Sequence, residues 1–201
     1  MCSIIYCYLG TVLVALKTMK KIFIIPILLI SLMLNELSLT AQETEKIFWS
    51  ESQQFDWGMF KEKRAGYGFI KAMTHSGISY EVDVKEGLIV LNVEAYFIYG
   101  KSWVMKGYKK PHLLAHEKIH FDISEMFKRR LDKLCDRYRV DYDTFVKRDY
   151  QEALQRDFDI IFDEMDEYQR EYDEDTSHGT ISFKQKKWEK DMREVLKNTT
   201  R

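Results

Sequence analysis

Two histidines and a glutamate at close spacing are the residues best suited to chemistry. Residues 116–120 have the sequence His-Glu-Lys-Ile-His. On a helix, this spacing separates the imidazoles of His116 and His120 by only about 40° in rotation and about 6 Å in rise, so both can bind one metal ion. A catalytic zinc ion takes three protein ligands and keeps a position for water, which Glu117 can approach as general base. Zinc lowers the pKa of this water towards about 7 and polarises a carbonyl group. The segment therefore predicts a Zn2+ site for amide hydrolysis.

A third protein ligand has to come from elsewhere in the chain. We expect it to be His178, which lies in a polar segment after a helix long enough to return to the motif. An exposed loop histidine is the alternative interpretation of this residue. His112 fits a solvated first helical turn, and His75 lies before a strand, as a turn histidine does. The carboxylates that stay open as alternatives are Asp122, Glu125, Asp163, Glu164 and Glu167.

A long helix has to carry the motif. Pro111 suits the first turn of a helix, and neither glycine nor proline follows before Gly179. The apolar residues recur about every 3.6 positions, which predicts one helix up to about Tyr138 and a second over 145–168, with a break near 140–143. The motif lies inside a well-patterned helix rather than in a loop, which argues against a chance occurrence.

Strand patterns precede these helices. Residues 78–84 alternate between apolar and polar side chains, and residues 88–99 do the same after a short turn, so we expect an antiparallel hairpin. A polar loop over 173–180 and a short helix over 183–196 are expected at the end of the chain. The predicted fold class is α+β: a small N-terminal antiparallel sheet followed by a helical body that carries the HExxH helix.

The composition is that of a globular domain without a strong charge imbalance. The 201 residues are 45% hydrophobic and 31% charged, with 31 Lys plus Arg against 32 Asp plus Glu. This balance gives no field that would favour nucleic acid, so we expect no nucleic-acid partner. Beyond the N-terminal segment the only cysteine is Cys135, which falls on an apolar helix stripe and is expected to be a small buried hydrophobe.

The N-terminus has the pattern of an export signal. Met19 is followed by two lysines, an apolar run over 22–34 and a polar-to-small segment that ends at Ala41. We therefore expect residues 1–41 to be a signal peptide region, with Met19 as the true start, and residues 42–201 to be one metallopeptidase-like domain. A membrane anchor is the alternative, but the apolar runs fall short of the roughly 20 residues that span a bilayer. The expected location is secreted, periplasmic or cell envelope, with membrane contact only during export.

Several segments together resemble one bacterial family. They are Phe48-Trp49-Ser50, Phe55 to Phe60, Ala72 to Tyr80, Ser102-Trp103-Val104, Leu113 to Ile123, and Tyr172 to Gly179 with Gln185 and Trp188. The family is carried as domain of unknown function nine-twenty-two and is regarded as secreted zinc-dependent proteases. The resemblance implies a zinc site at His116 and His120 with Glu117 as catalytic base, and it favours His178 as third ligand.

These features together predict a secreted or envelope zinc-dependent metallopeptidase. It would hydrolyse a peptide or protein substrate by a zinc-activated water. One alternative is a non-catalytic envelope protein in which zinc stabilises the helical body. Another is a helical interaction module in which the motif is accidental.

Overall fold

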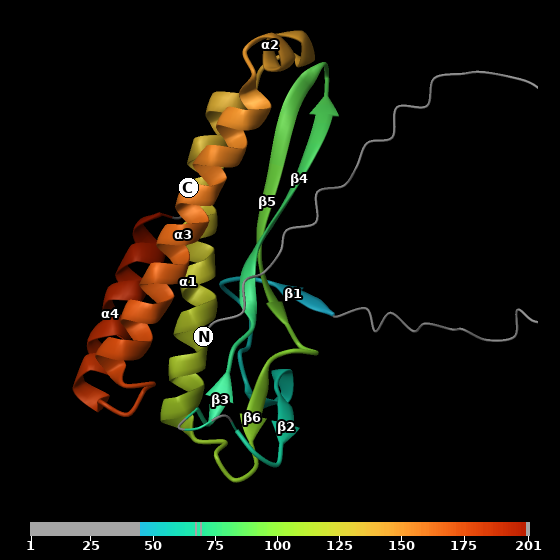
Figure 1. Ribbon diagram of the computed structural model, residues 1–201. Helices are drawn as coiled ribbons and strands as arrows, with labels where there is room; N and C mark the ends of the chain where they lie inside the picture. Colours follow the sequence, from blue (N-terminus) through green and yellow to red (C-terminus); the bar gives the residue numbers. More distant parts are fainter. Residues whose placement is uncertain (1–44, 67, 69, 200–201) are drawn as a thin grey trace, which may run out of the picture. The chain divides into compact units, whose positions relative to one another are not determined.

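A long β-hairpin and three long helices make up most of the described chain (Figure 1). The computed structural model describes residues 45–66, 68 and 70–199, so the expected signal region lies outside the described residues. The strands are β1 (Lys46–Phe48), β2 (Lys61–Lys63), β3 (Ala72–Met73), β4 (Ser76–Lys85), β5 (Leu88–Ile98) and β6 (Trp103–Met105). The α-helices are α1 (Pro111–Cys135), α2 (Tyr142–Lys147), α3 (Tyr150–Thr176) and α4 (Ser182–Asn198), with 3-10 turns at Trp57–Met59 and Asp136–Tyr138.

The predicted hairpin is confirmed. Strands β4 and β5 pair antiparallel along their whole length, with Ser76 opposite Phe97. Glu86 and Gly87 form the turn with φ angles of 53° and 79°, the left-handed conformation that two-residue hairpin turns require. Strand β1 pairs antiparallel with β5, which makes a first sheet in the order β1-β5-β4. A second sheet, β2-β6-β3, contains one parallel pair, β2 with β6, and one antiparallel pair. The fold is α+β, as predicted.

Helix α1 packs against the hairpin on one side and against α3 and α4 on the other (Figure 1). Its core-facing positions follow the predicted helical period. Ile123 and Leu131 are completely buried, and Ile119 and Phe127 are nearly so. With Phe158 of α3 and other residues they form the larger apolar core. Because one helix contacts both layers, its position fixes where the motif lies relative to the sheet and to α3.

A second apolar cluster holds the N-terminal half of α1 against the strands. Phe97 of β5 and Phe121 of α1 are buried, with ring centroids 5.8 Å apart. Phe60 packs edge-on against Phe97 at 5.2 Å, and Phe55 contacts both of these rings. Edge-to-face aromatic packing of this kind favours a single arrangement. This aromatic packing therefore holds Phe121 and the neighbouring motif residues of α1 in a fixed position.

The second predicted helix is divided into two. Helix α2 ends at Lys147 and α3 begins at Tyr150, with Asp149 between them at a φ angle of 53°.

Cys135 is buried, as predicted for a small hydrophobic side chain. Among the described helices, none combines the length and the apolar character that crossing a membrane requires.

Helix α3 ends later than the sequence predicted. A polar loop was expected over 173–180, but the helix continues to Thr176. Tyr172 and Thr176 are fully buried and stabilise this last turn by packing, which the polar local sequence does not indicate. The helix then ends in three consecutive left-handed residues, 177–179, with φ angles of 48°, 52° and 77°. The prediction of a loop at Asp173 was wrong, and this residue lies on a helix.

Candidate metal centre

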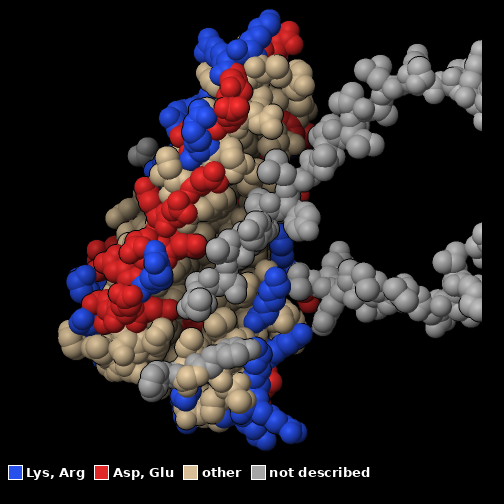
Figure 2. Space-filling model, in the orientation of Figure 1, with Lys and Arg blue, Asp and Glu red and all other residues tan. Residues whose placement is uncertain are grey.

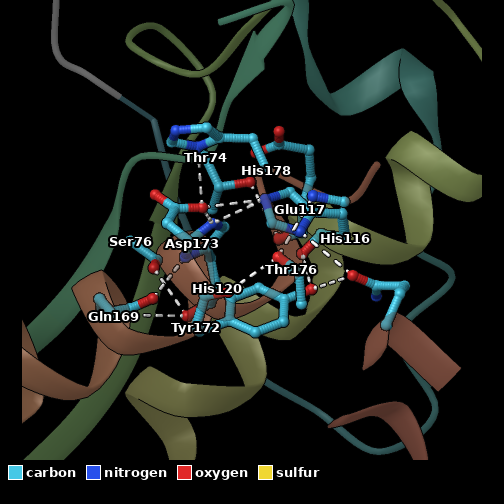
Figure 3. A network of polar contacts seen from close by, with 12 residues as sticks. Thr74, Ser76, His116, Glu117, His120, Gln169, Tyr172, Asp173, Thr176 and His178 are labelled. Carbon is cyan, nitrogen blue, oxygen red and sulfur yellow. Dashed lines mark hydrogen bonds and ion pairs between the residues drawn. The ribbon is translucent and has the colours of Figure 1, made fainter. Parts of the chain in front are cut away.

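Three ligand-type atoms from α1 and the end of α3 lie close together (Figure 3). The Nε2 atoms of His116 and His120 are 3.3 Å apart, and Oδ1 of Asp173 lies 3.0 Å and 3.1 Å from them. Ligand atoms bound to zinc at about 2.0–2.1 Å are spaced by about 3.3 Å in a tetrahedral site. Two imidazoles and a carboxylate are also a donor set that zinc accepts. The three atoms thus fit one face of a zinc coordination sphere.

The outward nitrogens of both imidazoles face glutamine side chains. Nδ1 of His116 lies 3.2 Å from Oε1 of Gln185, and Nδ1 of His120 is hydrogen-bonded to Oε1 of Gln169. The amide nitrogen of Gln169 donates to the His120 carbonyl, and that of Gln185 donates to Glu189. These contacts turn both amide oxygens towards the imidazoles, so that, with a cation bound between the Nε2 atoms, each Nδ1–H would donate to its glutamine and each Nε2 would present a lone pair. Carbonyl oxygens commonly orient metal-binding histidines in this way.

Glu117 lies beside this cluster and is 2% exposed. Its Oε2 atom has no hydrogen-bond partner among the described residues. Burial raises the pKa of Glu117 and outweighs the opposing charges of His120 and His116. A buried carboxylate oxygen without a partner costs free energy, and such groups are concentrated at sites where protons or ligands are exchanged.

The carboxylate of Asp173 dominates the local electrostatics. Burial acts to raise the pKa of Asp173, but hydrogen bonds with His116 and His120 outweigh it and hold this pKa well below its ordinary value. Burial likewise acts to lower the pKa of His120, and the hydrogen bond and charge of Asp173 overcome that effect and raise it. The charged carboxylate therefore makes the space between the imidazoles favourable for a cation.

His178 lies beside the cluster on its solvent side. Its Nδ1 atom is 3.2 Å from Oδ1 of Asp173, and its side chain is 48% exposed, whereas that of His116 is 3% exposed. Among the described residues, the ligand atoms that all lie within 4.8 Å of one another come from His116, His120 and Asp173. The structure thus brings His178 next to the predicted site, and its role as a ligand stays a prediction.

The alternative ligands considered from the sequence lie outside this cluster of ligand atoms. Four of the carboxylates pair with basic side chains: Asp122 with Lys118, Glu125 with Arg129, Glu164 with Arg130, and Glu167 with Arg170. Asp163 and His112 are exposed on α3 and on the first turn of α1. His75 lines a separate cavity near β6. None of these residues belongs to the close set of described ligand atoms.

Neighbouring elements hold the motif from three directions. The hydroxyls of Thr74 and Ser76 donate to backbone carbonyls of α1 within the motif, at 3.0 Å and 3.2 Å. The ring of Tyr172 stacks on that of His116 with centroids 4.7 Å apart. Gly179 approaches so closely that a Cβ atom there would lie 2.9 Å from Cβ of His116. The segment 74–76, Tyr172 of α3 and Gly179 after the end of α3 together restrict movement of the His116 ring.

Asp173 is the site residue that sequence reasoning missed. It lies four positions after Gln169 on α3, so both side chains project from the same face of the helix. The apolar period of α3, continued past Tyr168 to Tyr172, is the signal that could have placed Asp173 on that face. Because a loop was expected over 173–180, Asp173 was not assigned to a helix face.

Fold and site together define an α+β protein with a candidate metal centre between the described helices α1 and α3. Residues 107–179 match the model of a family described as bacterial protein of unknown function (DUF922). The matched segment contains both the motif and Asp173, and it supports the family resemblance seen in the sequence. No curated protein and no solved structure matches the chain.

Proposed function

We propose that the protein is a secreted or envelope zinc-dependent peptidase. In this proposal His116, His120 and Asp173 bind zinc, and Glu117 is the general base. The observation that carries it is the convergence of three ligand atoms, 3.0–3.3 Å apart, beside a buried carboxylate oxygen without a partner among the described residues. The location comes from the sequence pattern before residue 42 and is independent of the site.

The residues around the site have distinct roles in this proposal. Gln169 and Gln185 orient the imidazoles so that both Nε2 lone pairs face inward. Zinc bound there would supply Lewis acidity, polarising the peptide carbonyl and making water more acidic. Glu117 would accept a proton from the attacking water at its carboxylate and return it to the leaving amine, the usual task of a carboxylate in this position.

A second candidate function is a non-catalytic protein stabilised by zinc. It is favoured by the way the cluster joins three helices, because α1 supplies the histidines, α3 supplies Asp173 and α4 supplies Gln185. An ion bound at this junction would stabilise the helical body whether or not chemistry occurs.

The substitution Glu117→Gln separates the two functions. We expect the purified wild type to contain about one equivalent of zinc and to cleave members of a broad peptide library. The variant should keep its zinc but lose at least about 100-fold in hydrolysis rate, the usual contribution of a general base. Glu125→Gln is the matched control, because it removes another buried carboxylate of α1 that is paired with Arg129; its activity should stay near that of the wild type.

Two outcomes would contradict the peptidase proposal. Equal hydrolysis by the wild type and by the Glu117 variant, both loaded with zinc, would favour the stabilising role. A wild-type protein that binds no zinc, even after incubation with the ion, would exclude both functions.

A further inference from the structure

A second candidate site lies in a lysine-lined cavity away from the metal centre. The cavity has a volume of about 320 Å3, and its lining includes Lys61, Lys63, Lys101, Met73, His75 and Trp103. None of the described residues that line it is acidic. Three lysine side chains therefore face one hollow, and the described part of its wall carries no carboxylate.

The second sheet brings these lysines together. Lys61 and Lys63 lie two positions apart on β2, so their side chains share one face of the strand. Parallel pairing places β2 next to β6, and the backbone N–H of Lys61 donates to the carbonyl of Ser102 at 3.0 Å. Lys101 comes from the turn between β5 and β6. Figure 2 shows basic side chains gathered over this end of the molecule, below and to the right of the acidic side chains that cover the helices.

The charges and the walls of the cavity indicate the chemistry of its ligand. Like charges repel one another, so a polyanion that neutralises several ammonium groups is favoured. A phosphate monoester carries about −1.5 to −2 charges near neutral pH and matches the two ammonium groups of Lys61 and Lys101 better than a single carboxylate does. Burial, and next the charge of Lys101, lower the pKa of His75, which leaves a neutral imidazole able to donate one hydrogen bond.

The cavity also has an apolar side. Trp103 is 2% exposed, and the ammonium of Lys63 lies 4.6 Å from the centre of its ring. Met73 lies beside it in the wall. Met73 can therefore contact the organic part of a ligand, whereas Trp103 lies beneath Lys63 and supports the wall from inside.

The segment 73–76, which joins β3 to β4, separates this cavity from the metal centre. Successive side chains of a strand point to opposite faces. Met73 and His75 line the cavity, whereas Thr74 and Ser76 donate hydrogen bonds to the motif carbonyls of α1. The two sites therefore lie on opposite faces of the segment 73–76.

We propose that this cavity binds the phosphate group of a small phosphorylated molecule. The proposal does not depend on zinc binding or on peptidase activity. Calorimetric titration of the purified protein with glycerol 1-phosphate tests it, with glycerol as the neutral probe. We expect saturable binding that weakens with added salt and no binding of glycerol.

The double substitution Lys61→Gln/Lys101→Gln should weaken this binding at least about tenfold, since it removes two charge-assisted contacts. Lys186→Gln/Lys190→Gln is the matched control, because it removes the same charge from exposed positions of α4. Asp173→Ala should leave phosphate binding unchanged, which separates this site from the candidate metal centre. Should the double variant unfold, Lys101→Gln alone, in an exposed turn, provides the same comparison.

A lipid headgroup is the other source of the same phosphate chemistry. Vesicles that contain phosphatidic acid, whose headgroup is a phosphate monoester, compared with vesicles of phosphatidylcholine alone, distinguish it from a soluble ligand. Lysine-dependent binding to the anionic vesicles alone would assign the phosphate to a lipid. Absence of saturable binding to both probes, or equal weakening by the control variant, would overturn the proposal.

Discussion

Gln169 illustrates how single side chains decide the properties of the candidate centre. It accepts from Nδ1 of His120 and donates to the carbonyl of the same residue. The substitution Gln169→Leu keeps the approximate size of the side chain but removes both contacts. We expect zinc affinity to fall by about 10- to 100-fold, the usual effect of losing such an orienting partner. Competition with a chromogenic chelator measures this affinity.

Gln155→Leu provides the control for that measurement. Gln155 lies on the same helix but is exposed and contacts Asp159. Its substitution should leave zinc affinity unchanged. A similar loss of affinity in both variants would mean that the effect comes from α3 as a whole rather than from the imidazole orientation.

Asp173 and His178 can be separated by the same chelator assay. Asp173→Ala removes the oxygen that lies within 3.1 Å of both motif nitrogens. Zinc affinity should therefore fall by more than about 100-fold, which exceeds the loss expected when only an orienting partner is removed. His178→Ala should cost about tenfold or less, because this side chain is half exposed and contacts the cluster through Asp173. The reverse order of the two losses would restore His178 as the third ligand.

At the scale of elements, the end of α3 is the part that completes the centre. Gly179 has a φ angle of 77°, and a Cβ atom there would lie 2.9 Å from both Cβ and Cγ of His116. Gly179→Ala should therefore lower the free energy of unfolding by about 2–5 kcal/mol, the sum of left-handed strain and overpacking. It should also weaken zinc binding, since the His116 ring has to move. Urea denaturation and chelator competition measure the two effects.

Gly87→Ala is the matched control for this substitution. Gly87 has a similar φ angle of 79°, but a Cβ atom there would meet nothing within 4 Å. We expect a loss of about 1–2 kcal/mol from left-handed strain alone and an unchanged zinc affinity. Equal effects of both alanines would show that contact with His116 contributes nothing.

At the scale of the whole molecule, zinc binding should be coupled to global stability. The described helices α1, α3 and α4 meet at the cluster. An ion at 100 times its dissociation constant stabilises the folded state by about 2.7 kcal/mol. For a domain of this size, that corresponds to a rise in Tm of about 5–10 °C. Calorimetry with zinc and with a chelator should show this difference for the wild type and not for Asp173→Ala. A wild-type Tm that does not respond to zinc would contradict a metal centre at this junction.

Much of the fold could be predicted because its signals are local. The alternation of residues 78–84 and 88–99 predicted the hairpin, and the helical period after Pro111 predicted α1. The parallel pairing of β2 with β6 could not be predicted, since it joins short segments about 40 residues apart whose patterns are weak. The later end of α3 was missed for a related reason: Tyr172 and Thr176 stabilise it by tertiary burial.

The motif at 116–120 is where the sequence by itself determined most about this protein. Its spacing places two imidazoles and a carboxylate on one helix, because side chains four positions apart lie on the same face. Only the tertiary structure decided which side chain comes closest to both imidazoles. Asp173 lies 57 positions after His116, and their contact depends on how α3 packs on α1 and on which turn ends α3. Packing of buried side chains sets both; the apolar period up to Tyr172 could place Asp173 on a helix face, but it could not place it beside His116.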